Sequence, residues 1–306
     1  MYRIIHRTTY QYRSPVSVGN HVACLQPRNI AGRQFAQSQL HIHPSPVTRS
    51  ERVDYFGNAL CFFTIQEPHR ELIVEARSEV RLVEQPLIVP EKLIPWEEAA
   101  QSLPSDCSPE ELEAFQFRFE SPRIRVQQEF AAYARQSFTP RRPMREALLE
   151  LTTRIHNDFR FDTKVTNVRT SPEEVFKKRR GVCQDFAQVQ IACLRSINLA
   201  ARYVSGYLRT YAPPGKPRLI GADASHAWVS AYCPRIGWMD VDPTNDVVPS
   251  DGHVTVAWGR DYGDVSPLRG LVHGGGANNL KVAVDMEPME DEALVLAQPH
   301  VFSSGI

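Results

Sequence analysis

Residues 179–187 read Arg179-Arg180-Gly181-Val182-Cys183-Gln184-Asp185-Phe186-Ala187, and this stretch decides the fold. After Gly181 the apolar residues recur with helical spacing to about Ile197, which predicts a helix with Cys183 in its first turn. A helix N-terminus favours an anion, so it favours the reactive thiolate over the thiol. The stretch therefore predicts a nucleophilic Cys183, although taken alone it fits a buried cysteine at a helix start equally well.

A second segment alternates as a β-strand does. It reads Asp223-Ala224-Ser225-His226-Ala227-Trp228-Val229-Ser230-Ala231-Tyr232. The alternation places His226 and Trp228 on one face and the small apolar residues on the other. A strand histidine is often only a hydrogen-bonded core residue, and Trp228 fits either a wall of the site or core packing. A cysteine nucleophile, however, needs a base, and imidazole has the right ordinary pKa, so the sequence predicts that role for His226.

A third segment supplies the carboxylate. In Gly237-Trp238-Met239-Asp240-Val241-Asp242-Pro243-Thr244-Asn245, the run from Trp238 predicts the next strand, with Asp242 at its end. Two strands joined by a short turn are neighbours, so Asp242 can reach His226 and hold its imidazole in the required tautomer. Asp240 on the same strand face and Asp246 after the turn are the alternatives, and Asp242 before Pro243 also fits a simple turn-former. Asp242 is preferred because strand ends open into clefts.

In this Cys-His-Asp order the sequence resembles the transglutaminase-like superfamily, and specifically its bacterial branch of cysteine-protease-like members. The resemblance is carried by residues 181–187, 201–207 (Ala-Arg-Tyr-Val-Ser-Gly-Tyr), 225–228, 242–245 and 259–267 (Gly-Arg-Asp-Tyr-Gly-Asp-Val-Ser-Pro). Tyr10-Gln11-Tyr12 and Leu25-Gln26-Pro27-Arg28 resemble the N-terminal domain that precedes this core, so the match covers about residues 1 to 285. It implies Cys183 as nucleophile, His226 as base and Asp242 as orienting acid, with the backbone N–H of Cys183 as one oxyanion donor. Phe161 departs from the tyrosine of many relatives.

The predicted fold class is α+β, with an N-terminal antiparallel β domain in front of a transglutaminase-like, papain-like thiol-enzyme core of helices packed on an antiparallel sheet. Residues 71–82 alternate apolar and charged side chains, which is typical of a half-buried strand, and residues 59–66 form its predicted hairpin partner. Ser108-Pro109-Glu110-Glu111 is a helix start, the same start recurs at Ser171, and a helix is predicted from Pro143 to Phe159. The expected domains are residues 1–105, with a proline-rich linker at 86–107, then the core at 106–290 and a tail at 291–306.

Composition narrows the function classes. The 35 basic and 35 acidic residues give no net charge, which argues against nucleic acid or an anionic membrane as the main partner. Without a long apolar run or a secretory leader, we expect a cytoplasmic protein. The six cysteines contain no CxxC pair, so we expect reduced thiols and no disulfide. No metal or cofactor is implied, and the oligomeric state is not indicated.

The leading functional hypothesis is a thiol amidohydrolase or peptidase, which acts on an amide of a peptide or protein substrate through an acyl-enzyme on Cys183. The first alternative is a transglutaminase, because resolution of the same acyl-enzyme by a lysine amine needs the same triad. The second alternative is a peptide-binding module without catalysis, against which the intact Cys183, His226 and Asp242 argue.

Overall fold

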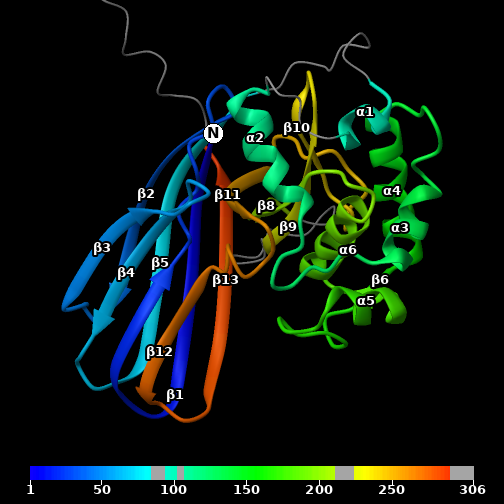
Figure 1. The fold of residues 1–306 in the computed structure, drawn as a ribbon. Coiled ribbons are helices and arrows are strands. Elements are labelled where there is room, and N and C mark those ends of the chain that lie inside the picture. The colour runs from blue at the N-terminus through cyan, green and yellow to red at the C-terminus, as the bar shows by residue number, and fades with distance from the viewer. Residues whose placement is uncertain (84–93, 102–106, 211–223, 290–306) are drawn as a thin grey trace, which may run out of the picture.

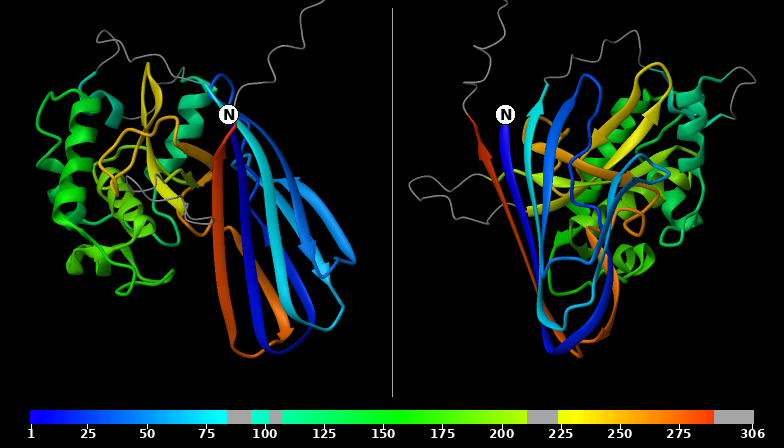
Figure 2. Two further views of the ribbon diagram at one scale, coloured as in Figure 1. Left: turned by 180° about the vertical axis from the view of Figure 1, so that it is seen from behind. Right: turned by 90° about the vertical axis from the view of Figure 1, so that its left-hand side faces the viewer.

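The computed structural model describes residues 1–83, 94–101, 107–210 and 224–289. A large antiparallel sheet and a helical half with its own sheet lie side by side (Figure 1). Figure 2 shows both halves from behind and from the side of the large sheet. The predicted α+β class is confirmed. Within the described residues, no helix is both long enough and apolar enough to cross a membrane.

The large sheet is built around its first strand. Its strands are β1 (Tyr2–Ala23), β2 (Gln34–His43), β3 (Thr48–Val53), β4 (Ala59–Ile65), β5 (His69–Leu82), β12 (Leu268–Gly274) and β13 (Asn278–Pro288). The main path runs β2-β5-β1-β4-β3, and β1 pairs in addition with β12 and β13. β1 can serve so many partners because it is 22 residues long: its first half lies between β5 and β13, and its last residues lie between β4 and β12.

The two C-terminal strands return to the N-terminal sheet. Tyr2 pairs with Pro288 along β13, and Ala23 pairs with Leu268 on β12. This return differs from the prediction, which assigned residues 106–290 as a whole to the core. A long strand offers backbone N–H and C=O groups on both sides, and β12 and β13 satisfy those that β4 and β5 leave open. The predicted tail at 291–306 lies outside the described residues.

The predicted helices are present. The helices are α1 (Trp96–Ala100), α2 (Pro109–Phe115), the 3₁₀ turn η2 (Gln116–Arg118), α3 (Gln128–Arg135), α4 (Met144–Asp158), α5 (Pro172–Lys178) and α6 (Cys183–Arg195). Ser108 and Glu111 form the expected capping box of α2. The apolar face of α4 is buried as predicted. The linker prediction is wrong at Trp96–Ala100, because Pro95 and two acidic residues start the short helix α1 there; residues 86–93 and 102–106 of that linker lie outside the described residues.

A smaller sheet lies at the centre of the helical half. Its strands run in the order β10 (Gly237–Val241), β9 (Ala224–Cys233), β8 (Ala201–Leu208) and β11 (His253–Gly259), all antiparallel. Helix α6 packs on β8 and β9. Ala227, Val229 and Ala231 are buried small residues on one face of β9, so they let the helix come close. Every side chain from Asp185 to Leu194 is buried, which makes α6 a core helix.

Two side-chain amides of the large sheet hold the edge strand β11. The amide of Gln34 donates to the carbonyl of Thr255 at 2.7 Å and accepts from its N–H at 2.9 Å. Asn58 makes the same two-point contact with Trp258, at 2.8 and 3.0 Å. They meet β11 on either side of the irregularity between Thr255 and Ala257. The large sheet therefore completes the hydrogen bonding of an edge strand in the other half.

The predicted exposure of one charged residue on β5, Glu75, is wrong. Glu75 was expected on the solvent face of this strand, but its side chain is only 7% exposed. It lies between the guanidinium groups of Arg7, at 2.6 Å, and Arg77, at 2.7 Å. These ion pairs outweigh the burial that acts against the charge and lower the pKa of Glu75.

Candidate active site

Cys183 is the first residue of α6, as the sequence predicts. Its side chain is partly exposed, whereas four of the other five cysteines are buried, and all six are free. The helix start is fixed by Asp185, which accepts hydrogen bonds from the backbone N–H of Val182 at 2.8 Å and from the hydroxyl of Thr166 at 2.6 Å. Residue 181 is glycine because a Cβ there would lie 2.6 Å from the Asp185 carboxylate. Asp185 thus stabilises the helix start.

His226 and Asp242 are in contact. Nε2 of His226 lies 2.7 Å from Oδ2 of Asp242, and the Asp242 side chain is fully buried. The structure therefore shows the contact between Asp242 and His226 that the sequence predicts. Asp240 does not make this contact: it pairs across the strands with Ser230, and its charge acts on Arg202.

The imidazole joins the carboxylate to the thiol. Burial lowers the pKa of His226, but hydrogen bonds to Asp242 and Cys183 outweigh this and raise its pKa to about 10. Since Nε2 is held by Asp242, Nδ1 is left for the Cys183 sulfur. Burial alone would raise the pKa of Asp242, yet its hydrogen bonds, the one with His226 first, hold that pKa well below its usual range. The structure thus brings the three predicted residues together, with His226 hydrogen-bonded to Asp242 and close enough to Cys183 to interact with it.

The turn after β10 and the start of β11 add donors that sequence reasoning missed. The backbone N–H groups of Thr244 and Asn245 donate to Oδ1 of Asp242 at 2.9 and 3.3 Å. The Asn245 amide donates to Oδ2 at 2.7 Å, and Nε2 of His253 lies 3.2 Å from the same oxygen. Asn245 belongs to the motif that carries the resemblance, which was the available signal for it. His253 had none, because it reaches Asp242 only through the pairing of β11 with β8.

A metal was not predicted, but the site contains a set of residue types that can bind one. The possible ligand atoms of His226, Asp242 and His253 lie within 4.8 Å of one another. Each imidazole is at hydrogen-bond distance from the same carboxylate oxygen, so a hydrogen-bonded acid accounts for the arrangement.

Trp228 packs beneath the site. It is 1% exposed, and its ring meets that of His253 edge-on, with centroids 5.3 Å apart. Of the two roles left open by the sequence, the burial favours core packing. Phe161 is exposed on the short strand β6 (Arg160–Phe161) and pairs with Gly181 of β7 (Arg180–Gly181), just ahead of Cys183.

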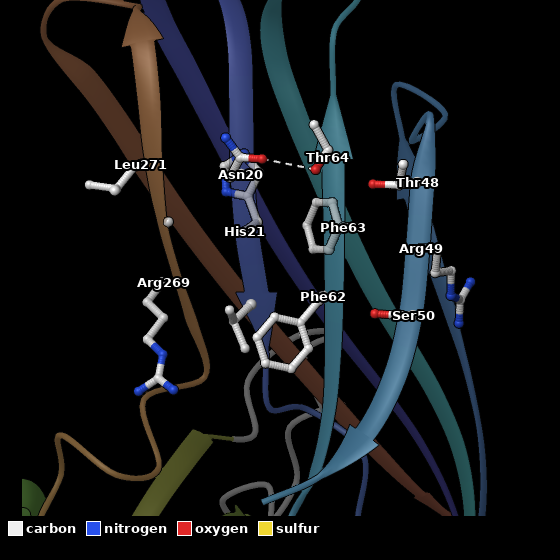
Figure 3. Close-up of a pocket in the computed structure, with 12 residues that line it drawn as sticks. Asn20, His21, Thr48, Arg49, Ser50, Phe62, Phe63, Thr64, Arg269 and Leu271 are labelled. Atoms are coloured by element: carbon white, nitrogen blue, oxygen red, sulfur yellow. Dashed lines mark hydrogen bonds between the residues drawn. The ribbon is translucent and has the colours of Figure 1, made fainter.

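A separate hollow of about 540 Å³ lies on the large sheet, among β1, β3, β4 and β12 (Figure 3). Asn20 and Thr64 are hydrogen-bonded within it, and Leu271 projects from β12. None of the three triad residues lines it, and its lining includes no carboxylate and no cysteine. The hollow is therefore distinct from the candidate active site.

The comparisons with known proteins agree with the fold. Residues 2–81 match the bacterial transglutaminase-like N-terminal region, and residues 131–243 match the transglutaminase-like superfamily. An uncharacterised protein of Mycobacterium tuberculosis H37Rv is 40% identical over 302 residues, which covers 96% of this chain and 94% of that protein.

Two further relatives are more distant. A protein-glutamine gamma-glutamyltransferase of Pseudomonas aeruginosa is 33% identical over 97 residues, 31% of this chain and 14% of that protein. A solved structure from Cytophaga hutchinsonii, of a protein proposed to be a cysteine protease, superposes with a TM-score of 0.71 at 22% identity. The superposition covers 95% of this chain and 92% of that one.

The fold is that of a transglutaminase-like protein. The chain belongs to the transglutaminase-like superfamily, with the bacterial N-terminal region of that family in front of its core.

Proposed function

We propose that the protein is a thiol amidohydrolase or peptidase that acts on an amide of a peptide or protein substrate. The observation that carries this proposal is the position of His226, whose Nε2 lies 2.7 Å from Oδ2 of Asp242 and whose imidazole also interacts with the Cys183 thiol. A binding module would need neither a partly exposed thiol nor a buried acid behind the imidazole.

The first half-reaction forms an acyl-enzyme. The Cys183 thiolate attacks the amide carbonyl, the C–N bond breaks, and the imidazolium of His226 gives its proton to the departing amine. The proposed donor to the oxyanion is the backbone N–H of Cys183, which as the first residue of α6 has no partner within the helix. Asp242 keeps its charge beside His226 and stabilises the imidazolium.

The second half-reaction releases the acid. Neutral His226 removes a proton from water, the hydroxide attacks the thioester carbonyl, and the C–S bond breaks to return the Cys183 thiolate and the imidazolium. Atoms balance as one water consumed for each amide cleaved. No cofactor takes part in either step.

Amine transfer is the second candidate, and the similarity to the gamma-glutamyltransferase of P. aeruginosa favours it. In that case a primary amine, rather than water, attacks the thioester after His226 removes a proton from it. Both reactions share the first half-reaction, so the triad serves either. The outcome is decided by whether the acceptor side excludes water and holds an amine.

The test is incubation of the protein with a mixed peptide library and a primary amine, followed by mass spectrometry. Peptide cleavage, side-chain deamidation and amine incorporation each give a distinct mass change. Cys183→Ala is the control for the nucleophile, and Cys107→Ser is the matched control for loss of a partly exposed thiol. Turnover that persists in Cys183→Ala would refute the proposed chemistry.

A further inference from the structure

His253 is a buried side chain at this site that the steps above do not use. It is the first residue of β11, and its side chain is 6% exposed. Its Nε2 lies 3.2 Å from Oδ2 of Asp242, the oxygen that His226 contacts from 2.7 Å. A carboxylate oxygen only accepts hydrogen bonds, so both imidazoles direct an Nε2–H toward it. Two histidines therefore share one oxygen of the acid.

The direction of the Asp242 carboxylate is fixed without His253. Two backbone N–H groups, of Thr244 and Asn245, hold Oδ1, while the Asn245 amide and His226 hold Oδ2. With both oxygens held, the carboxylate has no need of a further donor for its orientation. The effect of His253 is therefore mainly electrostatic: it stabilises the same negative charge on which the His226 imidazolium depends.

The surroundings of His253 fix which of its nitrogens carries the proton. Its Nδ1 is buried and has no hydrogen-bond partner among the described residues. A proton on Nδ1 would be a buried donor without an acceptor, which costs more than an unused lone pair, so the proton resides on Nε2. The edge of the Trp228 ring packs on this imidazole, and the Trp228 ring lies so close to Gly206 that a Cβ there would be 2.4 Å from it. The ring of His253 is thus held with its N–H toward Asp242.

We propose that His253 is a positioning residue that weakens the hold of Asp242 on His226, so that the imidazolium releases its proton to the departing amine. A carboxylate with His226 as its main ionic partner would retain that proton more strongly, and a general acid works best when its pKa is near the operating pH. The proposal rests on the thiol chemistry proposed above, but its test needs no substrate.

The test compares His253→Met with His253→Gln in the full-length chain. Both side chains are unbranched and of similar size, and only glutamine carries an N–H that can reach Asp242. The pKa of His226 is measured by NMR titration of its Cε1–H signal, assigned by its loss in His226→Gln. We expect His253→Met to raise this pKa by roughly half to one unit, and His253→Gln to leave it near the wild-type value.

The proposal would be overturned if the pKa of His226 were equal in the two variants, or if it were lower in His253→Met than in the wild type. If neither variant folds, His253 is a structural residue and the proposal fails as well. A wild-type protein that turned over no amide would refute the proposed function while the titration stayed readable. If the enzyme is active but the pKa of His226 is the same whichever residue occupies position 253, only this inference is refuted.

Discussion

Oδ2 of Asp242 lies 2.7 Å from Nε2 of His226, although Asp240 is the carboxylate nearer to His226 in sequence. Asp240 sits opposite Ser230 within β10 and β9, whereas Asp242 follows the last residue of β10. There the backbone turns, and the N–H groups of Thr244 and Asn245 bind Oδ1, which leaves Oδ2 for the imidazole. The position at the strand end, rather than the strand face, selects the acid.

Asp242→Asn and Asp240→Asn should therefore differ in their effect on kcat. Asparagine at 242 removes the charge that stabilises the imidazolium and can present an N–H to it, so we expect kcat to fall about 10²–10⁴-fold with the fold intact; the upper figure is the precedent from serine triads, and a thiolate depends less on its base. Asp240→Asn should change kcat by less than about threefold, because its charge faces Arg202. The assay is turnover of whichever amide the library screen identifies. A reversed order of the two variants would show that the wrong acid was chosen.

Much of the candidate site could be predicted because its determinants are local. The start of α6 needs only Gly181, Cys183 and Asp185, which are within five residues of one another. His226 lies on β9 and Asp242 directly follows β10, and one short turn joins these strands, so strand alternation and proximity in sequence were sufficient to predict that a carboxylate of this segment reaches His226. Family resemblance then chose among the carboxylates.

The rest depends on pairings between distant segments. His253 meets Asp242 because β11 pairs with β8, and nothing in its own segment indicates that pairing. Glu75 alternates as an exposed residue does, and the arrival of Arg7 from β1, in addition to Arg77 on its own strand, makes its burial tolerable. The return of β12 and β13 to β1 likewise follows from open hydrogen-bonding groups on a strand at the other end of the chain.

Cys183 should be the first cysteine to be alkylated at neutral pH. It is partly exposed and interacts with the imidazole of His226, while burial raises the pKa of Cys24 and Cys233 to about 12 and that of Cys193 well above its usual range. Mass-spectrometric mapping of iodoacetamide adducts on the native protein measures the order of labelling. Cys107 is the internal reference, since it is the other partly exposed thiol.

We expect His226→Gln to slow labelling of Cys183 by about tenfold or more and to leave Cys107 unchanged, because the imidazolium favours the thiolate. Labelling of a buried cysteine ahead of Cys183 would contradict the nucleophile assignment.

Stability should fall in acid because of His6. This residue joins β1 to β8: its Nδ1 donates to the Tyr207 hydroxyl at 3.1 Å, Tyr207 donates to the Leu25 carbonyl at 3.0 Å, and Thr8 donates to Nε2 at 3.0 Å. Burial lowers the pKa of His6 to about 4. Between pH 6.5 and 4 the unfolded chain binds a proton here that the folded chain does not, so the free energy of unfolding decreases as the pH falls through this window.

The expected loss from His6 is on the order of 2–3 kcal/mol by pH 4. It is measured by urea unfolding at several pH values. His6→Gln should be less stable at pH 7 but should lose less stability between pH 6.5 and 4. The same substitution at exposed His41 on β2 is the matched control and should leave the pH dependence as in the wild type. If His6→Gln and the wild type have the same pH dependence, His6 is not the titrating group.

Asn58→Ala should loosen β11 from the large sheet. The Asn58 amide is fully buried and makes the two-point contact with the backbone of Trp258, so its removal leaves a buried N–H and a buried carbonyl without partners. Each such group costs about 1–3 kcal/mol, so we expect the free energy of unfolding to fall by roughly 2–4 kcal/mol. Asn157→Ala is the matched control: this residue is exposed on α4, and its replacement should stay within about 0.5 kcal/mol of the wild type.

Amide hydrogen exchange gives the local readout, because the Trp258 N–H should lose protection in Asn58→Ala while N–H groups within α6 keep theirs under native conditions. An Asn58→Ala variant as stable as the Asn157→Ala control, with Trp258 still protected, would show that the amide does not hold the strand.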